Sequence, residues 1–262
     1  RYSQTLALED GGYLIMWRPG DGGDVPLRMQ RFGEDGRTIG VETEVALGVD
    51  PAEVANLPES FLVEPLGGDN FALLWRDADG NYQVQCFDVT GAALTGVTTI
   101  DAVAPLSDRM DIDLRADGHL QITWVGSDAN IYHFIVEDVP SIPTGGSSPV
   151  EEALGTELVS TVYTASSPSV AYQADGSWLL VWSSSDGSGN GVWGQRYAAD
   201  GSTLGAIYQI NTNPADSQDG AQVTTLADGS FVVTWHEGYA LYGQRLDQAG
   251  QVVGAEFSIG TG

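Results

Sequence analysis

Acidic residues cluster in five short, glycine-containing segments, each of which follows a tryptophan. The segments read "RPGDGGDVP", "RDADGNY", "VGSDANI", "SSSDGSGNG" and "HEGYA". Calcium binds about six to eight oxygen ligands, often from Asp side chains and backbone carbonyls of glycine-containing loops. The same residue types are the ordinary residues of hairpin turns, so a purely structural turn is the alternative. Calcium binding is expected at five carboxylates: Asp21, Asp24, Asp77, Asp79 and Asp128.

The residues expected to bind an organic ligand lie in the fourth and fifth segments and in the strand that follows the fourth. Tyr and Trp rings offer apolar faces to a pyranose ring, and neighbouring polar groups can bond its hydroxyls. Packing between sheets is the alternative role for the tryptophan in this set. The expected ligand-binding residues are Asp186, Asn190, Trp193, His236, Glu237 and Tyr239.

The chain carries no recognisable catalytic motif. G-x-S-x-G, the phosphate-binding G-x-x-x-x-G-K and paired-histidine metal motifs are all absent from the sequence. Carboxylates are so numerous that no single pair indicates glycoside hydrolysis, which requires a defined separation. We therefore expect a domain without catalytic activity, with a glycan-acting enzyme as the alternative.

These segments are positioned by an internal repeat of about fifty residues, which occurs five times. Each unit reads as four strands, a to d; in the fourth unit they are "PSVAYQ", "SWLLVWS", "GVWGQRYA" and "LGAIYQIN". An Asp-Gly pair between strands a and b predicts a tight hairpin with a two-residue turn. A glutamine in strand c, replaced by His133 in the third unit, is expected to bond the backbone of a neighbouring unit. The repeat is anchored by tryptophans expected to pack in the core: Trp17, Trp75, Trp124, Trp182 and Trp235.

Four-stranded units of this length predict an all-β, five-bladed β-propeller with four antiparallel strands in each blade. In such a fold the b–c and d–a loops share one face, and these loops vary most here, so the ligand is expected there. The Pro/Gly/Ser-rich insertion at 138–152 is expected to be a surface loop on the opposite face. The whole chain, 1–262, is expected to be one domain with blades at approximately 1–48, 58–104, 109–164, 168–213 and 220–262.

The charge of the chain excludes several partners. Ten basic residues stand against 36 acidic ones, which gives a formal net charge of −26. This charge repels nucleic acid phosphates and anionic lipid. The sequence contains no apolar run long enough for a membrane span, and Cys86 alone permits neither an internal disulfide nor a cysteine-based metal site.

The fourth and fifth units resemble a known bacterial repeat. "ADGSWLLVWSSSDGSGNGVWGQRYAADGSTLG" and "LADGSFVVTW…LYGQRLDQAGQVVGAEF" are similar to repeats of large secreted RTX-type adhesins and calcium-dependent surface proteins. The resemblance implies an extracellular module at a bacterial cell surface, exported within a very long polypeptide. We expect the domain to be monomeric and to be a piece of a larger protein. The G-G-x-G-x-D nonapeptide that names this family is absent here.

The function expected from the sequence is a non-catalytic binding module of an adhesin. Its partner would be a cell-surface glycan or another surface ligand, with Ca²⁺ as the candidate cofactor. A structural spacer without a ligand and a glycan-acting enzyme are the alternatives.

Overall fold

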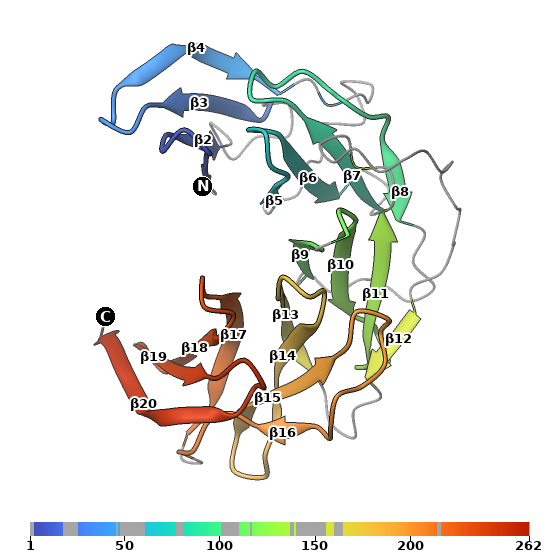
Figure 1. Ribbon diagram of the computed structural model, residues 1–262, viewed down its shortest axis with the longest axis vertical. Coiled ribbons are helices and arrows are strands. Elements are labelled where there is room, and N and C mark those ends of the chain that lie inside the picture. The colour runs from blue at the N-terminus through green and yellow to red at the C-terminus, as the bar shows by residue number, and fades with distance from the viewer. Residues whose placement is uncertain are drawn as a thin grey trace. The chain divides into compact units, whose positions relative to one another are not determined.

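The computed structural model describes residues 3–17, 26–45, 47, 61–76, 81–100, 110–115, 117–136, 139, 156–159, 165–213 and 216–261. The described residues form five four-stranded antiparallel sheets and no helix (Figure 1). None of them belongs to a helix long and apolar enough to cross a membrane. In each sheet the four strands are consecutive in the chain and pair in order, and we call the sheets blades 1 to 5.

The chain divides into two compact units, and the first, Arg1–Ala102 with Val136–Leu154, contains blades 1 and 2. Blade 1 consists of β1 (Ser3–Ala7), β2 (Tyr13–Trp17), β3 (Arg28–Phe32) and β4 (Thr38–Glu44). Blade 2 consists of β5 (Leu62–Pro65), β6 (Phe71–Arg76), β7 (Tyr82–Phe87) and β8 (Thr98–Ile100).

The second unit, Val103–Ile135 with Gly155–Gly262, contains the other three blades. Blade 3 consists of β9 (Met110–Leu114), β10 (Leu120–Val125), β11 (Ile131–Val136) and β12 (Thr156–Val159). Blade 4 consists of β13 (Ser166–Tyr172), β14 (Trp178–Ser185), β15 (Asn190–Tyr197) and β16 (Tyr208–Gln209). Blade 5 consists of β17 (Gln218–Thr225), β18 (Phe231–Glu237), β19 (Ala240–Leu246) and β20 (Val252–Thr261).

Apolar side chains between successive blades form the core of each unit. In the first unit Leu14 and Met16 of blade 1 pack in one cluster with Phe71 and Trp75 of blade 2. The predicted core role of the repeat tryptophans is confirmed for the four that are at most 2% exposed: Trp75, Trp124, Trp182 and Trp235. Trp17 is only partly buried.

The a–b hairpins are one residue longer than the predicted two-residue turns. In blade 4, Gln173 N donates to Ser177 O (2.8 Å) and Gly176 N donates back to Gln173 O (2.9 Å), which leaves a three-residue loop. Gly176 has φ +82°, the left-handed conformation that such a loop needs at its last position. The aspartate before it accepts a hydrogen bond from Ser177 N (3.0 Å), so this acidic residue stabilises the turn.

The strand c glutamines bond within their own blade, so the expected bond to a neighbouring blade is wrong. The Nε2 atom of each donates to a carbonyl in strand d or in the segment that leads into it: Gln30 to Ile39 (3.1 Å), Gln85 to Thr95 (2.8 Å), Gln195 to Gly205 (3.2 Å) and Gln244 to Val253 (3.0 Å). In blades 1 and 5 the c–d register shifts at this point. The glutamine therefore satisfies a carbonyl that the irregular ladder leaves without a backbone donor.

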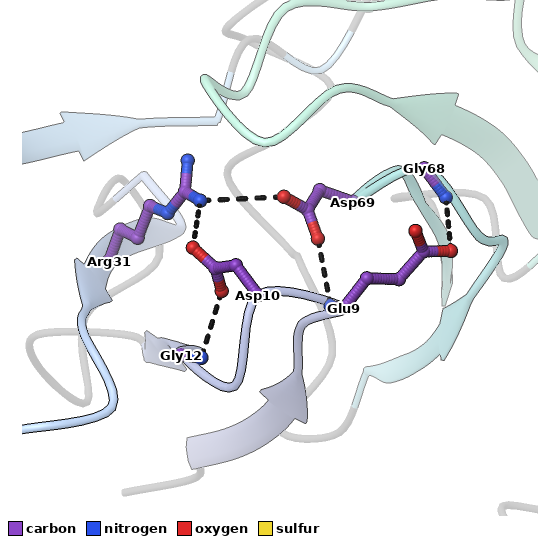
Figure 2. Close-up of polar contacts among 6 residues, drawn as sticks. All are labelled: Glu9, Asp10, Gly12, Arg31, Gly68 and Asp69. Carbon is purple, nitrogen blue, oxygen red and sulfur yellow. Dashed lines mark hydrogen bonds and ion pairs between the residues drawn. The ribbon is translucent and has the colours of Figure 1, made fainter.

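A polar clasp joins the a–b turns of blades 1 and 2 (Figure 2). The Arg31 guanidinium lies 2.7 Å from a carboxylate oxygen of Asp10 and 3.4 Å from one of Asp69. Asp69 also accepts a hydrogen bond from Glu9 N (3.0 Å), and the Glu9 side chain accepts one from Gly68 N (2.8 Å). Charged turn residues of these blades are thus used in structural contacts.

Candidate functional site

Asp186, expected to bind a ligand, stabilises its own b–c loop. Its Oδ1 atom accepts hydrogen bonds from Ser188 N (2.9 Å) and Gly189 N (3.2 Å), and Oδ2 accepts one from Gln209 Nε2 (3.2 Å). These bonds, above all that from Ser188 N, hold the pKa of the Asp186 carboxyl below its usual value. Both carboxylate oxygens are engaged in folding this loop.

Asn190 and Trp193 also have structural partners. Asn190 donates from Nδ2 to Asp219 Oδ1 (2.7 Å) and from its backbone N to Ser217 Oγ (3.2 Å), which joins blade 4 to blade 5. The Trp193 indole donates to Ser184 O (3.1 Å), and its ring packs against the core cluster of blades 3 and 4.

The three expected binding residues of blade 5 lie at its b–c hairpin. Tyr239 is 93% exposed, and His236 is exposed as well. Glu237 is partly buried and accepts a weak hydrogen bond from Asn213 Nδ2 (3.4 Å). These residues can be reached by a ligand, and their binding role stays a prediction.

Of the five carboxylates expected to bind calcium, only Asp128 lies among the described residues. Asp21, Asp24, Asp77 and Asp79 lie outside them, as does the 138–152 insertion apart from Val139. Asp128 accepts hydrogen bonds from Tyr132 OH (2.6 Å) and from the backbone and side chain of Asn130 (3.2 and 3.1 Å). Its pKa is lowered, chiefly by the Tyr132 bond. Among the described residues no three His, Cys, Asp or Glu side chains are grouped so that they could hold a metal ion.

A pocket of about 280 Å³ lies between blades 3 and 4, within the second unit. It lies at the a–b turns, at the opposite end of the strands from the b–c loops that the sequence emphasises. Strands β9 and β13 lie side by side (Figure 1). The pocket lies where they end, because Arg115 follows β9 and Tyr172 is the last residue of β13. The lining residues are Arg115, Asp117, Tyr172, Ala174, Asp175, Gly176 and Ala199.

Charged groups surround an aromatic ring in this pocket. Arg115 bonds Asp117 through Nε (3.1 Å to each oxygen) and through a terminal nitrogen (2.7 Å), and its guanidinium carbon lies 5.8 Å from the centroid of the Tyr172 ring. Burial raises the pKa of Asp117, but the bonds from Arg115 and from His119 N outweigh burial and lower it. The Ser177 hydroxyl bond lowers the pKa of Asp175. Both carboxyl groups are therefore ionised at neutral pH.

Behind the pocket, blade 3 turns a polar face toward blade 4. The pairing of β9 with β10 places Asp111 opposite Thr123 and Asp113 opposite Gln121. The bond from Gly126 N to Asn130 O (2.9 Å) and the stacking of Trp124 on Tyr132 indicate an antiparallel register of β10 with β11 in which His133 is opposite Thr123. We call Asp111, Gln121, Thr123 and His133 the polar row.

Two members of the polar row have strongly shifted pKa values. Burial raises the pKa of Asp111 to about 6, although Val170 N donates a hydrogen bond to its Oδ2 atom (2.7 Å). Burial, helped by the Arg115 charge, lowers the pKa of His133 to about 4. Asp111 thus retains some of its proton near pH 6, whereas His133 is neutral there.

Apart from His133, no residue of the polar row or of the pocket is singled out by the sequence analysis. One signal was present: the third unit reads "HLQITW" where the fourth reads "SWLLVW" and the first "GYLIMW". Thr123 and Gln121 stand at the positions of Val181 and Leu179 in blade 4. Only the pairing with β9 and the contact with β13 show that these polar side chains share one buried face.

Solved structures with a similar fold include several that bind or act on carbohydrate. The α-L-arabinanase of Penicillium chrysogenum in complex with arabinobiose has 11% identity and a TM-score of 0.64, over 98% of this chain and 80% of that one. An ulvan lyase bound to -[GlcA(1-4)Rha3S]- has 9% identity and a TM-score of 0.62, over 99% and 69%. The SapL1 lectin in complex with α-methyl fucoside has 15% identity and a TM-score of 0.51, over 98% and 81%. No protein-family model and no curated protein matches the chain.

These likenesses confirm the predicted fold class, an all-β, five-bladed β-propeller with four antiparallel strands in each blade. They also correct one expectation. The sequence led us to expect a domain without catalytic activity. That prediction is wrong for a protein with this fold, because the solved structures similar to it are mostly glycan-acting enzymes. At identities this low, structural similarity shows a shared fold and does not establish the activity of this chain.

Proposed function

We propose that this protein is a carbohydrate-active β-propeller that binds and hydrolyses a neutral glycan, with one sugar unit held in the pocket between blades 3 and 4. The observation that carries the proposal is the lining of that pocket. A tyrosine ring, a guanidinium and two ionised carboxylates surround the same space. The glycan-bound and glycan-acting neighbours with this fold support the same class of ligand.

The chemistry of the pocket suits a sugar. An aromatic ring packs against the C–H face of a sugar, while charged groups form strong hydrogen bonds with its hydroxyls. The lining is completed by three small residues, Ala174, Gly176 and Ala199. Asp117 and Asp175 supply acceptors, and Arg115 supplies donors.

Net charge favours a neutral glycan over an anionic one. The formal charge is −26. Each arginine whose side chain the structure describes bonds a carboxylate or a neutral acceptor of the chain itself: Arg28, Arg31, Arg37, Arg115, Arg196 and Arg245. A polymer that carries carboxylate or sulfate groups, such as the ligand of the ulvan lyase, would approach a field of its own sign.

Hydrolysis is the proposed reaction because carboxyl groups in different protonation states lie at and behind the pocket. Glycoside hydrolysis pairs a protonated acid with an ionised carboxylate. Asp117 and Asp175 are the ionised candidates, and Asp111, with a pKa raised to about 6, is the candidate acid. An adhesin context outside the cell is part of the proposal and is supported by the repeat resemblance alone.

The experiment is an activity screen on purified protein with neutral polysaccharides (arabinan, galactan and mannan) and with anionic ones (pectate and a sulfated polymer). We expect new reducing ends from a neutral polymer, and at least a tenfold loss of rate in Asp117→Asn. Asp200→Asn is the matched control, because Asp200 caps a c–d turn outside the pocket. Binding without product would overturn hydrolysis, and the absence of both would overturn the proposed function.

A further inference from the structure

Gln121 and Thr123 of the polar row occupy positions that are apolar in blades 1 and 4. One and three residues before the repeat tryptophan, blade 4 has Val181 and Leu179, which pack in the core with blade 5. Blade 1 has Met16 and Leu14 at these positions, packed with blade 2. Blade 3 has Thr123 and Gln121, and both are fully buried at 0% exposure. Blade 3 therefore buries hydrogen-bonding groups where blades 1 and 4 bury hydrocarbon.

Three polar atoms of this row have no hydrogen-bond partner among the residues that the structure describes. They are Gln121 Nε2, Thr123 Oγ1 and His133 Nδ1. A buried polar atom without a partner destabilises the fold, and folded proteins contain few of them. Three on one face of one sheet form the arrangement expected where a bound molecule supplies the missing partners.

The opposite wall of this interface is aromatic. The Tyr172 ring of blade 4 lies 5.8 Å from the Trp178 ring, and Trp178 stacks on Tyr197 at 4.0 Å. These tryptophan and tyrosine rings belong to a core cluster that reaches Val125 and Ile131 of blade 3. Polar groups on one side and aromatic faces on the other match the two kinds of surface that a sugar ring presents.

The unpaired atoms of the polar row indicate which class of ligand can bind there. Gln121 Nε2 is a donor, while the threonine hydroxyl and a neutral histidine can each donate or accept. An anion is disfavoured by Asp111 and Asp113 on the same face, and no cluster of metal ligands is present among the described residues. A hydroxyl group both donates and accepts, so a neutral polyol satisfies this set without adding charge.

Tyr172 connects this row to the pocket. Its ring lines the pocket, and its hydroxyl donates a hydrogen bond to Gln121 Oε1. The Tyr172 hydroxyl thus makes, at the pocket side of the polar row, the hydrogen bond that a ligand hydroxyl would make. When the Tyr172 side chain moves away, a ligand hydroxyl can replace the Tyr172 hydroxyl at Gln121 Oε1. The unpaired atoms of the polar row then become accessible to the ligand.

We propose that the polar row Asp111, Gln121, Thr123 and His133 is a binding site for the hydroxyl groups of a neutral sugar, reached from the pocket by displacement of Tyr172. The proposal rests on the proposed function and deepens it, because it assigns the recognition of the sugar to blade 3. Thr123 and Gln121 are specificity-determining residues in this account.

The first test uses the unmodified protein, labelled with ¹⁵N, and arabinobiose and α-methyl fucoside as probes. We expect the imidazole nitrogen signals of His133 to shift with sugar concentration along the calorimetric binding curve. His236 is the internal control, because it is exposed at the b–c hairpin of blade 5. A sugar that binds by calorimetry and leaves the His133 signals unmoved would overturn the proposal.

The second test is Thr123→Val, which removes the unpaired hydroxyl and keeps the side-chain shape. We expect a higher Tm without sugar and a Kd for the bound sugar raised about tenfold. Thr234→Val is the matched control, since Thr234 also precedes the repeat tryptophan but lies in blade 5, and its sugar Kd should stay unchanged. An unchanged Kd in Thr123→Val would contradict the inference while the proposed function stands. If the unmodified protein binds no neutral sugar at all, the proposed function itself fails; if Thr123→Val does not fold, the His133 signals decide.

Discussion

Asp111 shows how a buried polar interface changes the chemistry of one side chain. Its carboxylate accepts a hydrogen bond from Val170 N, yet burial still raises its pKa from 3.8 to about 6. Burial disfavours the charged form of an acid more than one backbone donor can offset. The group therefore favours the folded state at low pH and opposes it once it is ionised.

The sign of this effect gives a stability prediction. Because the folded pKa is raised, the stabilising contribution is full below pH 3.8 and is lost as pH rises through about 6. Asp111→Asn has no charge to bury, so it should be more stable than the unmodified protein at pH 8, by about 3 kcal/mol at most. The difference should vanish near pH 4. His133 titrates equally in both proteins, so the difference in free energy of unfolding isolates Asp111.

Urea unfolding of both proteins across this pH range measures the effect. A constant difference between Asp111→Asn and the unmodified protein at every pH would contradict the raised pKa of Asp111.

Single residues also mark the limit of prediction from sequence. Trp75 and Trp182 could be assigned to the core because the repeat period and the apolar residues beside them both predict burial. The partner of Asn190, Asp219, lies 29 residues further along the chain and across a blade interface, so no local pattern indicates it. The buried state of Gln121 and Thr123 was equally hidden, because polar residues in a strand ordinarily face solvent.

At the scale of elements, the b–c loop of blade 4 is a joint between blades. Asp186 folds the loop, and Asn190 ties it to Ser217 and Asp219 of the segment that leads into blade 5. A strand-based repeat predicts that such a loop exists, whereas its docking on a neighbouring segment depends on tertiary contacts. The Asp-Gly turns and the strand order were predictable because they depend on local chemistry.

Gly189 in this loop offers a test of the docking. A Cβ atom there would lie 2.5 Å from the backbone oxygen of Asp216 and 3.1 Å from its carbon, so one backbone must move. Gly189→Ala should lower stability by about 1–3 kcal/mol. Gly96→Ala is the control, since nothing lies within 4 Å of its Cβ position. Thermal unfolding compares the two, and equal Tm values would show that the loop is not docked as described.

At the scale of the whole molecule, charge decides which glycans can approach. The acidic excess is large, and every arginine whose side chain the structure describes is already bonded within the chain. Calcium at the acidic b–c segments remains a prediction that concerns chiefly residues outside the described part of the chain.

This charge predicts how binding depends on salt. Affinity for a neutral oligosaccharide should stay within about twofold between roughly 50 mM and 1 M NaCl, because no ion pair forms. An anionic oligosaccharide of the same length should bind weakly at low salt and gain affinity as salt screens the repulsion. Calorimetry at both salt concentrations measures this, and tight low-salt binding of the anionic oligosaccharide would contradict the assignment of a neutral ligand.

The central claim is that a neutral sugar binds between blades 3 and 4. The most direct measurement is a crystal structure of the protein soaked with arabinobiose. The account predicts sugar density beside Arg115, Asp117 and Tyr172, with the Tyr172 hydroxyl moved away from Gln121. Sugar density at His236 and Tyr239 of the blade 5 hairpin, with the pocket residues unchanged, would contradict it.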